Sequence, residues 1–237
     1  MSSVNKIVFL IITSALFFVF PAMAAEEVNG KTFYTIANIW YERPDQIESS
    51  NYHKGTILPV GTKVKITEVR DGTWPVTGGS LNSDRWKLSI RFTDESGQSY
   101  EILYISRHAK EGTSIWDFFR QYFSENNPLA EGGAFTSLTG EEQKRVKEGV
   151  IATGMSKKAV VMAYGYPPGH RTPSLEQDKW IYWISRFKTR AVYFSDNMVM
   201  PEPRGARRPS SIDQCIRACK ENTSRTSEQC FDDCKRE

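Results

Sequence analysis

The sequence has few of the residues from which catalytic centres are built. Its 237 residues include four cysteines and three histidines, and no cysteine precedes Cys215. A cysteine–histidine hydrolase needs a nucleophilic cysteine in its folded body, and residues 1–214 contain none. A histidine-based metal centre would need His53, His108 and His170 to converge. Serine-elbow, zinc-protease, phosphate-loop, dinucleotide-loop and calcium-loop motifs are also missing. We therefore expect no enzyme activity, no metal and no cofactor.

The sequence also lacks a strong charge of one sign and a second long apolar run. The formal net charge is +3, with 25% charged residues of both signs interspersed along the chain. Nucleic-acid-binding proteins usually carry a strongly basic patch, so we expect no nucleic acid partner. Beyond the N-terminal segment, no apolar stretch is long enough to cross a bilayer. We therefore expect no transmembrane anchor in the mature protein.

The one long apolar run covers residues 6–20 and follows a single lysine, Lys6. A proline and the small-residue motif Ala22-Met23-Ala24 come directly after it. A charged start, a short apolar run and such a motif are typical of a secretory signal peptide. An uncleaved anchor is the alternative, but the run ends at a helix breaker. We predict a signal peptide over residues 1–24, cleaved near Ala24 and Ala25, and a periplasmic product without a lipidated cysteine.

The next segment, residues 25–110, has the pattern of a small β-barrel. Short β-rich runs alternate with Gly, Pro, Asn and Asp, as in small antiparallel barrels and sandwiches. Val64 and Ile66 alternate with lysines, which predicts one buried and one solvated face. The phrase G-T-x-L-P-x-G-T-x-V-x-I at residues 55–66 resembles bacterial SH3-like barrels, and the resemblance implies binding of peptides, glycans or proteins. The clearest strands are predicted at residues 31–41, 62–69, 85–92 and 99–105.

Residues 111–135 are predicted to connect this barrel to the next domain through a helix and a linker. Ile115, Phe118, Phe119 and Tyr122 follow helical spacing over residues 113–124. An aromatic helix of this kind could also lie on a membrane surface, but it has no cationic face to hold it on anionic lipid. We therefore expect these aromatic side chains to pack in a core.

Residues 136–200 are predicted to form a small α+β domain of two helices and an antiparallel sheet. The first helix is expected over residues 141–151. The second is expected over residues 154–164, with Ser156 as its N-cap and Gly165 at its end. A turn at Asp196 and Asn197 should join the last two strands. The expected strands cover residues 179–184, 190–194 and 198–199.

Three phrases in this domain resemble one family. They are G-M-S-x-x-x-V-x-x-A-x-G-x-P at residues 154–167, W-x-Y-W at 180–183 and V-Y-F-S-D-N-M-V at 192–199. Together they resemble the SmpA/OmlA (BamE-like) family of small outer-membrane lipoproteins. The resemblance implies a protein-binding module and a role in assembling outer-membrane β-barrel proteins. The chain differs from the family by its missing lipidated cysteine, its preceding barrel and an inserted loop at residues 167–173, which favours a different partner.

The last segment, residues 210–237, is predicted to be a disulfide-linked helical hairpin after a Pro/Arg-rich linker at residues 201–209. Its cysteines have the spacing C-x3-C-x10-C-x3-C, and residues i and i+4 of a helix share a face. The spacing resembles the twin C-x3-C hairpins of small intermembrane-space chaperones in geometry. Four cysteines allow three pairings. The nested one, favoured by two antiparallel helices, joins Cys215 to Cys234 and Cys219 to Cys230.

A zinc site and a redox-active pair are the alternatives for these four cysteines. Structural zinc sites more often use C-x2-C spacing, and an exported chain meets an oxidising compartment. Redox pairs usually occur as C-x-x-C beside a βαβ unit. Disulfides are therefore favoured over zinc, and zinc over redox chemistry.

Two binding-type domains without catalytic residues predict a protein that acts by protein–protein interaction in the cell envelope, for example in envelope or outer-membrane assembly. The first alternative is a module that binds peptidoglycan or another glycan by stacking sugar rings on aromatic side chains. The second is a cell-wall hydrolase with an unrecognised site. The candidate binding surface consists of Trp40, Tyr41, Trp74, Trp86, His170 and Arg171.

Overall fold

A computed structural model describes residues 28–48, 52–71, 88–185 and 188–203, together with residues 219, 220, 226 and 230. The predicted signal peptide at residues 1–24 lies outside the described residues, as do Trp74, Trp86, Cys215 and Cys234. Within the described part of the chain, no helix has the length and apolar character that a membrane crossing requires.

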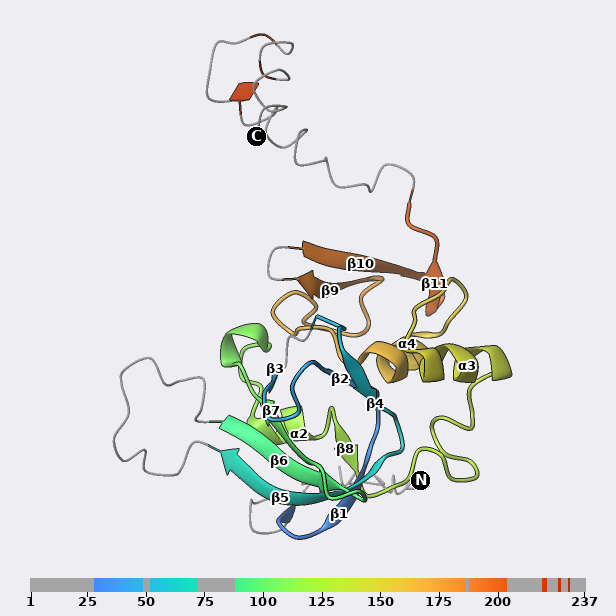
Figure 1. The fold of residues 1–237 in the computed structure, drawn as a ribbon. Coiled ribbons are helices and arrows are strands. Elements are labelled where there is room, and N and C mark those ends of the chain that lie inside the picture. Colours follow the sequence, from blue (N-terminus) through green and yellow to red (C-terminus); the bar gives the residue numbers. More distant parts are fainter. Residues whose placement is uncertain are drawn as a thin grey trace, which may run out of the picture.

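The first half of the molecule is a curled six-stranded sheet that forms a half-barrel (Figure 1). Neighbouring strands are antiparallel except for one parallel pair, β3 and β7. Val64 and Ile66 are buried while Lys63 and Lys65 are exposed, which confirms the predicted alternation. In sheet order the strands are β3 (Ile47–Glu48), β7 (Ser99–Leu103), β6 (Leu88–Asp94), β5 (Lys63–Asp71), β1 (Thr32–Thr35) and β8 (Phe123–Ser124).

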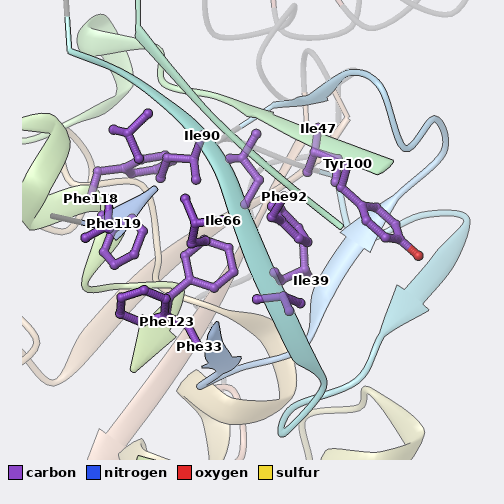
Figure 2. Close-up of a cluster of buried hydrophobic side chains, with 14 of the residues drawn as sticks. Phe33, Ile39, Ile47, Ile66, Ile90, Phe92, Tyr100, Phe118, Phe119 and Phe123 are labelled. Atoms are coloured by element: carbon purple, nitrogen blue, oxygen red, sulfur yellow. The ribbon is translucent and has the colours of Figure 1, made fainter. Parts of the chain in front are cut away.

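A core of aliphatic and aromatic side chains fills this curled sheet (Figure 2). The short helix α2 (Ile115–Phe119) begins at Ser114, whose hydroxyl accepts the Asp117 N–H, and it contributes three buried side chains. The expected core packing of this aromatic segment is confirmed, but the predicted helix over residues 113–124 is too long. The helix ends early because Phe123 pairs with Thr35 of β1, which makes β8 part of the sheet.

The second half consists of two helices against a three-stranded antiparallel sheet. Trp180 and Tyr182 are fully buried against the helices. The predicted cap is confirmed, because the Ser156 hydroxyl accepts the Ala159 N–H, and Asp196 and Asn197 form the predicted turn with left-handed φ of 51° and 63°. The elements are α3 (Gly140–Glu148), α4 (Lys157–Tyr164), β9 (Lys179–Ser185), β10 (Lys188–Ser195) and β11 (Met198–Met200).

A two-stranded ribbon joins the halves. It pairs β2 (Ile39–Tyr41) with β4 (Thr56–Leu58) in antiparallel register. Ile39 and Leu58 belong to the first core, whereas Val60, just after β4, belongs to the second. The ribbon therefore places the first half directly against the helices of the second.

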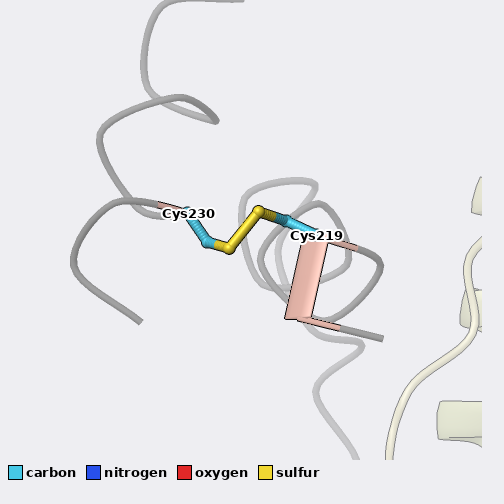
Figure 3. The surroundings of a disulfide bond; sticks show 2 residues. All are labelled: Cys219 and Cys230. Carbon is cyan, nitrogen blue, oxygen red and sulfur yellow. A yellow bond between two sulfur atoms is a disulfide. The ribbon is translucent and has the colours of Figure 1, made fainter. Parts of the chain in front are cut away.

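Of the predicted cysteine pairs, the structure shows one. Cys219 and Cys230 are joined by a disulfide with a Cα–Cα distance of 5.7 Å (Figure 3). This is the inner pair of the predicted nested connectivity, and it leaves neither cysteine available as a zinc ligand. Disulfides persist in non-reducing compartments, so the bond agrees with a protein that is exposed to such an environment.

Candidate functional site between the two halves

The two halves meet at the C-terminal end of α4. The last carbonyl groups of a helix lack partners within the helix and carry its negative dipole end. Here the first half supplies the donors: the Asn38 N–H donates to the Met162 carbonyl at 2.8 Å. The Trp40 Nε1 donates to the Ala163 carbonyl at 3.4 Å. We call these contacts, together with those of His53 described below, the seam.

Asn38 is the most buried polar residue of the seam, with 2% of its surface exposed. Its Nδ2 donates to the Val146 carbonyl of α3 at 2.7 Å and to the Ala163 carbonyl of α4 at 3.2 Å. Its Oδ1 accepts the Val60 N–H at 2.9 Å. One side chain thus caps both helices and fixes the chain after β4.

His53 completes the seam from a left-handed backbone conformation, with φ of 55°. Its Nε2 lies 2.8 Å from the Tyr164 carbonyl and its Nδ1 lies 3.2 Å from the Trp183 carbonyl of β9. The ring also stacks on Tyr164, with centroids 4.1 Å apart. Burial lowers the pKa of His53 to about 4, and the positive charge of Arg190 lowers it further. The two carbonyl contacts act in the opposite direction, because they favour the charged ring. The imidazole is therefore neutral at pH 7 and donates to one carbonyl at a time.

Trp40 and Tyr41, two of the predicted binding aromatics, have packing partners in the structure. The Trp40 indole lies in the seam, and its ring approaches His53 and Tyr164 edge-on. Tyr41 packs edge-on against Tyr100 with centroids 5.5 Å apart. Both side chains are half-buried. Their contacts account for their burial, and a role in stacking sugar rings stays a prediction.

A pocket of about 210 Å³ opens between the halves beside the seam. We call it the interlobe pocket. Its wall from the first half is aromatic: Tyr104 and Tyr122 each pack on Phe118 with centroids 4.9 Å apart. Its wall from the second half is the loop after α4. The lining residues used below are Tyr104, His108, Lys110, Tyr122, Tyr166 and Pro168.

The two walls of the interlobe pocket are held together by direct contact of their loops. The His170 N–H and Nδ1 lie 3.3 Å and 2.9 Å from the His108 carbonyl, at the end of the 3-10 turn η2 (Ser106–His108). A Cβ on Gly169 would lie 2.5 Å from the Lys110 nitrogen, so only glycine permits this approach. His108 and His170 thus hold the two loops together.

Several polar groups in the interlobe pocket have no protein partner. The Arg107 Nε donates to the His108 Nε2 at 3.3 Å, so the proton of the neutral ring lies on Nδ1. That Nδ1 is buried and has no hydrogen-bond partner. Burial, followed by the charges of Arg107 and His170, lowers the pKa of His108, which keeps the ring neutral. A buried donor without a partner is unusual in a folded protein.

Two phenol groups add to this set of donors. The hydroxyls of Tyr122 and Tyr166 line the pocket and form no hydrogen bond with the described residues. Burial raises the pKa of both side chains, so both keep their protons. By contrast, the Tyr104 hydroxyl already donates to the Thr113 carbonyl at 2.7 Å. The hydroxyls of Tyr122 and Tyr166 are therefore donors that no described residue of the protein pairs with.

His170 and Arg171, the other predicted binding residues, lie beside Trp183 and are not among the residues that line the interlobe pocket. The His170 ring is stacked near His108 at 5.3 Å and near Trp183 at 6.2 Å. The Arg171 guanidinium lies 5.8 Å from the centre of the Trp183 indole. These two residues thus lie near each other in the loop after α4, while Trp40 and Tyr41 lie in the seam and at the first core. Their role in binding stays a prediction.

Sequence reasoning did not single out the tyrosines and Lys110 of the pocket. They come from segments more than 40 residues apart, and no local spacing links them. The only signal was the inserted loop at residues 167–173, which supplies most of the second wall. Across the residues that the structure describes, no three His, Cys, Asp or Glu side chains are grouped as a metal site would require.

Comparisons of the chain with family models, with curated proteins and with solved structures gave no match. The SmpA/OmlA-like and SH3-like assignments therefore stay predictions from the sequence phrases. What the structure adds is the mixed α+β architecture, the half-barrel and the interlobe pocket.

Proposed function

We propose that this chain is a non-catalytic, exported protein of the cell envelope that acts by binding another protein. The observation that supports this proposal is the size and lining of the interlobe pocket. Pockets for small-molecule ligands usually measure about 300–1,000 Å³, whereas this one measures about 210 Å³. Such a volume fits one side chain or one chain end of a partner. Aromatic walls are typical of sites that hold extended peptide segments.

Two further observations agree with an envelope location. The sequence begins with the features of a cleaved signal peptide, and the Cys219–Cys230 disulfide fits an oxidising compartment such as the periplasm. The resemblance of residues 154–199 to the BamE-like module supports a role in envelope or outer-membrane assembly.

Photo-crosslinking in intact cells tests the proposed binding. A photo-reactive amino acid replaces Gln121, which lines the interlobe pocket, and in a matched control it replaces Gln98, which is exposed in the β6–β7 turn. We expect a discrete crosslinked envelope protein from position 121 and none from position 98. Absence of any crosslinked protein from position 121, or the same products from both positions, would contradict the proposal.

Intact-mass measurement tests export separately. The protein purified from the periplasm should have a mass that starts near Ala25, and alkylation should modify its cysteines only after reduction. A full-length mass with freely alkylated Cys219 and Cys230 would place the chain in a reducing compartment.

A further inference from the structure

The charge of the interlobe pocket indicates what it selects. Among its described lining residues, Lys110 is the one side chain with a full charge at pH 7, and neither Asp nor Glu occurs. Lys110 is exposed and forms no ion pair with the described residues. Outside the lining, Arg107 is held against His108, while the acidic side chains of Glu48 and Asp117 act on His108 and Tyr104. Asp117 is paired with Arg120. A ligand with negative charge is therefore favoured over a neutral or positive one.

The hydrogen-bonding groups of the pocket point to the same kind of ligand. The His108 Nδ1 and the hydroxyls of Tyr122 and Tyr166 are donors without partners. An unpaired donor in a site of this kind favours a ligand that brings an oxygen acceptor. Hydrogen bonds from neutral donors to a charged acceptor are about twice as strong as those between neutral groups. Two phenol donors without protein partners match a carboxylate, which accepts through two oxygens.

The walls limit how large the group beside this carboxylate can be. Tyr104, Phe118 and Pro168 provide flat apolar surface next to the donors, and the volume is about 210 Å³. A carboxylate on a short apolar stem fills such a space, and a larger ligand would have to extend out of it. The C-terminus of a peptide and the side chain of Glu or Asp both have this shape.

We infer that the interlobe pocket binds a carboxylate group of a partner polypeptide, with Tyr122 and Tyr166 as hydrogen-bond donors and Lys110 as the counter-charge. This inference rests on the proposed function and names the chemistry that the partner presents. The carboxylate belongs to a chain end or to an acidic side chain, and short peptides distinguish these two sources.

The test uses the full-length mature protein and three acetylated tripeptides, followed by NMR signals of the tyrosine rings. The first, Ala-Ala-Phe, has a free C-terminal carboxylate, the second is its C-terminal amide, and the third is Ala-Glu-Phe amide. With a Kd of about 1 mM, ~10 mM peptide occupies most sites. We expect saturable shifts with the first or the third peptide and at least tenfold weaker binding of the second. Binding of the first peptide alone indicates that the partner presents a chain end, and binding of the third indicates an acidic side chain.

Substitution of one donor ties the binding to the pocket. Tyr122→Phe removes one hydroxyl and keeps the ring that packs on Phe118, so the fold should be retained, and we expect about tenfold weaker binding of the carboxylate peptide. Tyr34→Phe, in β1 outside the pocket, is the matched control and should bind like the wild type. Tyr166→Phe serves as a second variant if Tyr122→Phe does not fold.

Three results would overturn the inference. They are binding of the second peptide as tight as that of the better-binding carboxylate peptide, binding that neither tyrosine variant weakens, and no saturable binding of any peptide at ~10 mM. In the last case a crosslink from position 121 in cells would leave the proposed protein binding intact, while its absence would remove both. The two failures are therefore distinguishable.

Discussion

Asn38 shows how one buried side chain can hold two helices and a ribbon together. Removing its amide in Asn38→Ala leaves the buried Val60 N–H without its acceptor and takes one donor each from the Val146 and Ala163 carbonyls. Each unsatisfied buried group costs about 1–3 kcal/mol. We expect the free energy of unfolding to fall by about 2–4 kcal/mol in urea titrations.

The matched control is Asn126→Ala, because the Asn126 side chain is exposed and forms no side-chain hydrogen bond with the described residues. Its effect should stay within about 0.5 kcal/mol. Equal stability of the two variants would show that the seam does not depend on Asn38.

His53 makes the stability of the seam depend on pH. Its pKa in the folded protein is about 4, below its usual 6.5, mainly because of burial. Between these values the unfolded chain binds more protons than the folded one, so stability is full above pH 6.5 and is lost as the pH falls towards 4. The difference corresponds to at most about 3 kcal/mol. His53→Gln should lose less stability than the wild type over this range in urea titrations.

The control for this pH dependence is His170→Gln, which removes an exposed histidine and keeps His53. The carboxylates titrate in the wild type and in both variants, so their contribution to the pH dependence of stability cancels when the three proteins are compared. The same acid-induced loss in wild type and His53→Gln would contradict the role given to His53.

At the scale of secondary structure elements, the sequence predicted what short-range chemistry determines. The start of α4 at Ser156 and its end at Gly165 follow from a cap and a glycine that act within one turn. β8 and the early end of α2 were missed. Two residues become β8 only because β1 offers a pairing edge, and this depends on contacts from distant parts of the chain.

The end of α3 illustrates a contact that needs glycine for two separate reasons. Gly149 has φ of 65°, and a Cβ there would lie 2.5 Å from Trp40 and 2.6 Å from Ile57. Gly132 has a similar φ of 71° with open space around it. Gly132→Ala should therefore cost about 1 kcal/mol for the backbone alone. Gly149→Ala should cost at least about 2 kcal/mol more, because Trp40 and Ile57 must move.

Thermal or urea unfolding of the two glycine variants provides this comparison. Equal losses of stability would mean that the ribbon adapts to an added methyl group. In that case the contact between α3 and β2 would not be as tight as the structure shows.

Glu142 links the starts of α3 and α4 electrostatically. Its carboxylate accepts the N–H and hydroxyl of Thr139 at 3.0 Å each, and those of Ser156 at 2.9 Å and 2.6 Å. Burial raises its pKa, but these bonds outweigh burial and lower the pKa to about 2. Stability from Glu142 is therefore present above about pH 4.5 and is lost as the pH falls towards 2.

Glu142→Gln replaces one acceptor oxygen by an NH2 group that faces these same donors. We expect it to lower the free energy of unfolding at pH 7 by about 2 kcal/mol in urea titrations. Glu141→Gln at the neighbouring exposed position, where Glu141 pairs with Arg145, should cost less than about 0.5 kcal/mol. Similar losses of stability in both variants would mean that the effect comes from the negative charge at the start of α3 and not from the hydrogen bonds of Glu142.

At the scale of the whole molecule, the site was less predictable than its parts. The α+β order and the β-rich first half follow from periodicity, which is local. The interlobe pocket depends on how residues 104–122 meet residues 166–175, and this meeting is fixed by the seam and by Gly169. The sequence pointed to His170 and Arg171, which do not line the pocket, whereas Tyr122, which does, was assigned only to a core.

The seam also determines how the molecule unfolds. Each half has its own hydrophobic core, so two separate transitions would be the simple expectation. The carbonyls at the end of α4, however, obtain their donors from the first half, so unfolding either half exposes buried polar groups of the other.

We predict a single cooperative transition, in which β6 and β10 exchange their amide hydrogens with opening free energies within about 1 kcal/mol of each other. Mass-spectrometric hydrogen exchange measures both strands in one sample. Reduction of the Cys219–Cys230 disulfide should leave both values unchanged, because it lies outside the two cores, whereas Asn38→Ala should separate them. Two distinct opening energies in the wild type would mean that the halves fold independently and that the pocket between them opens and closes without unfolding.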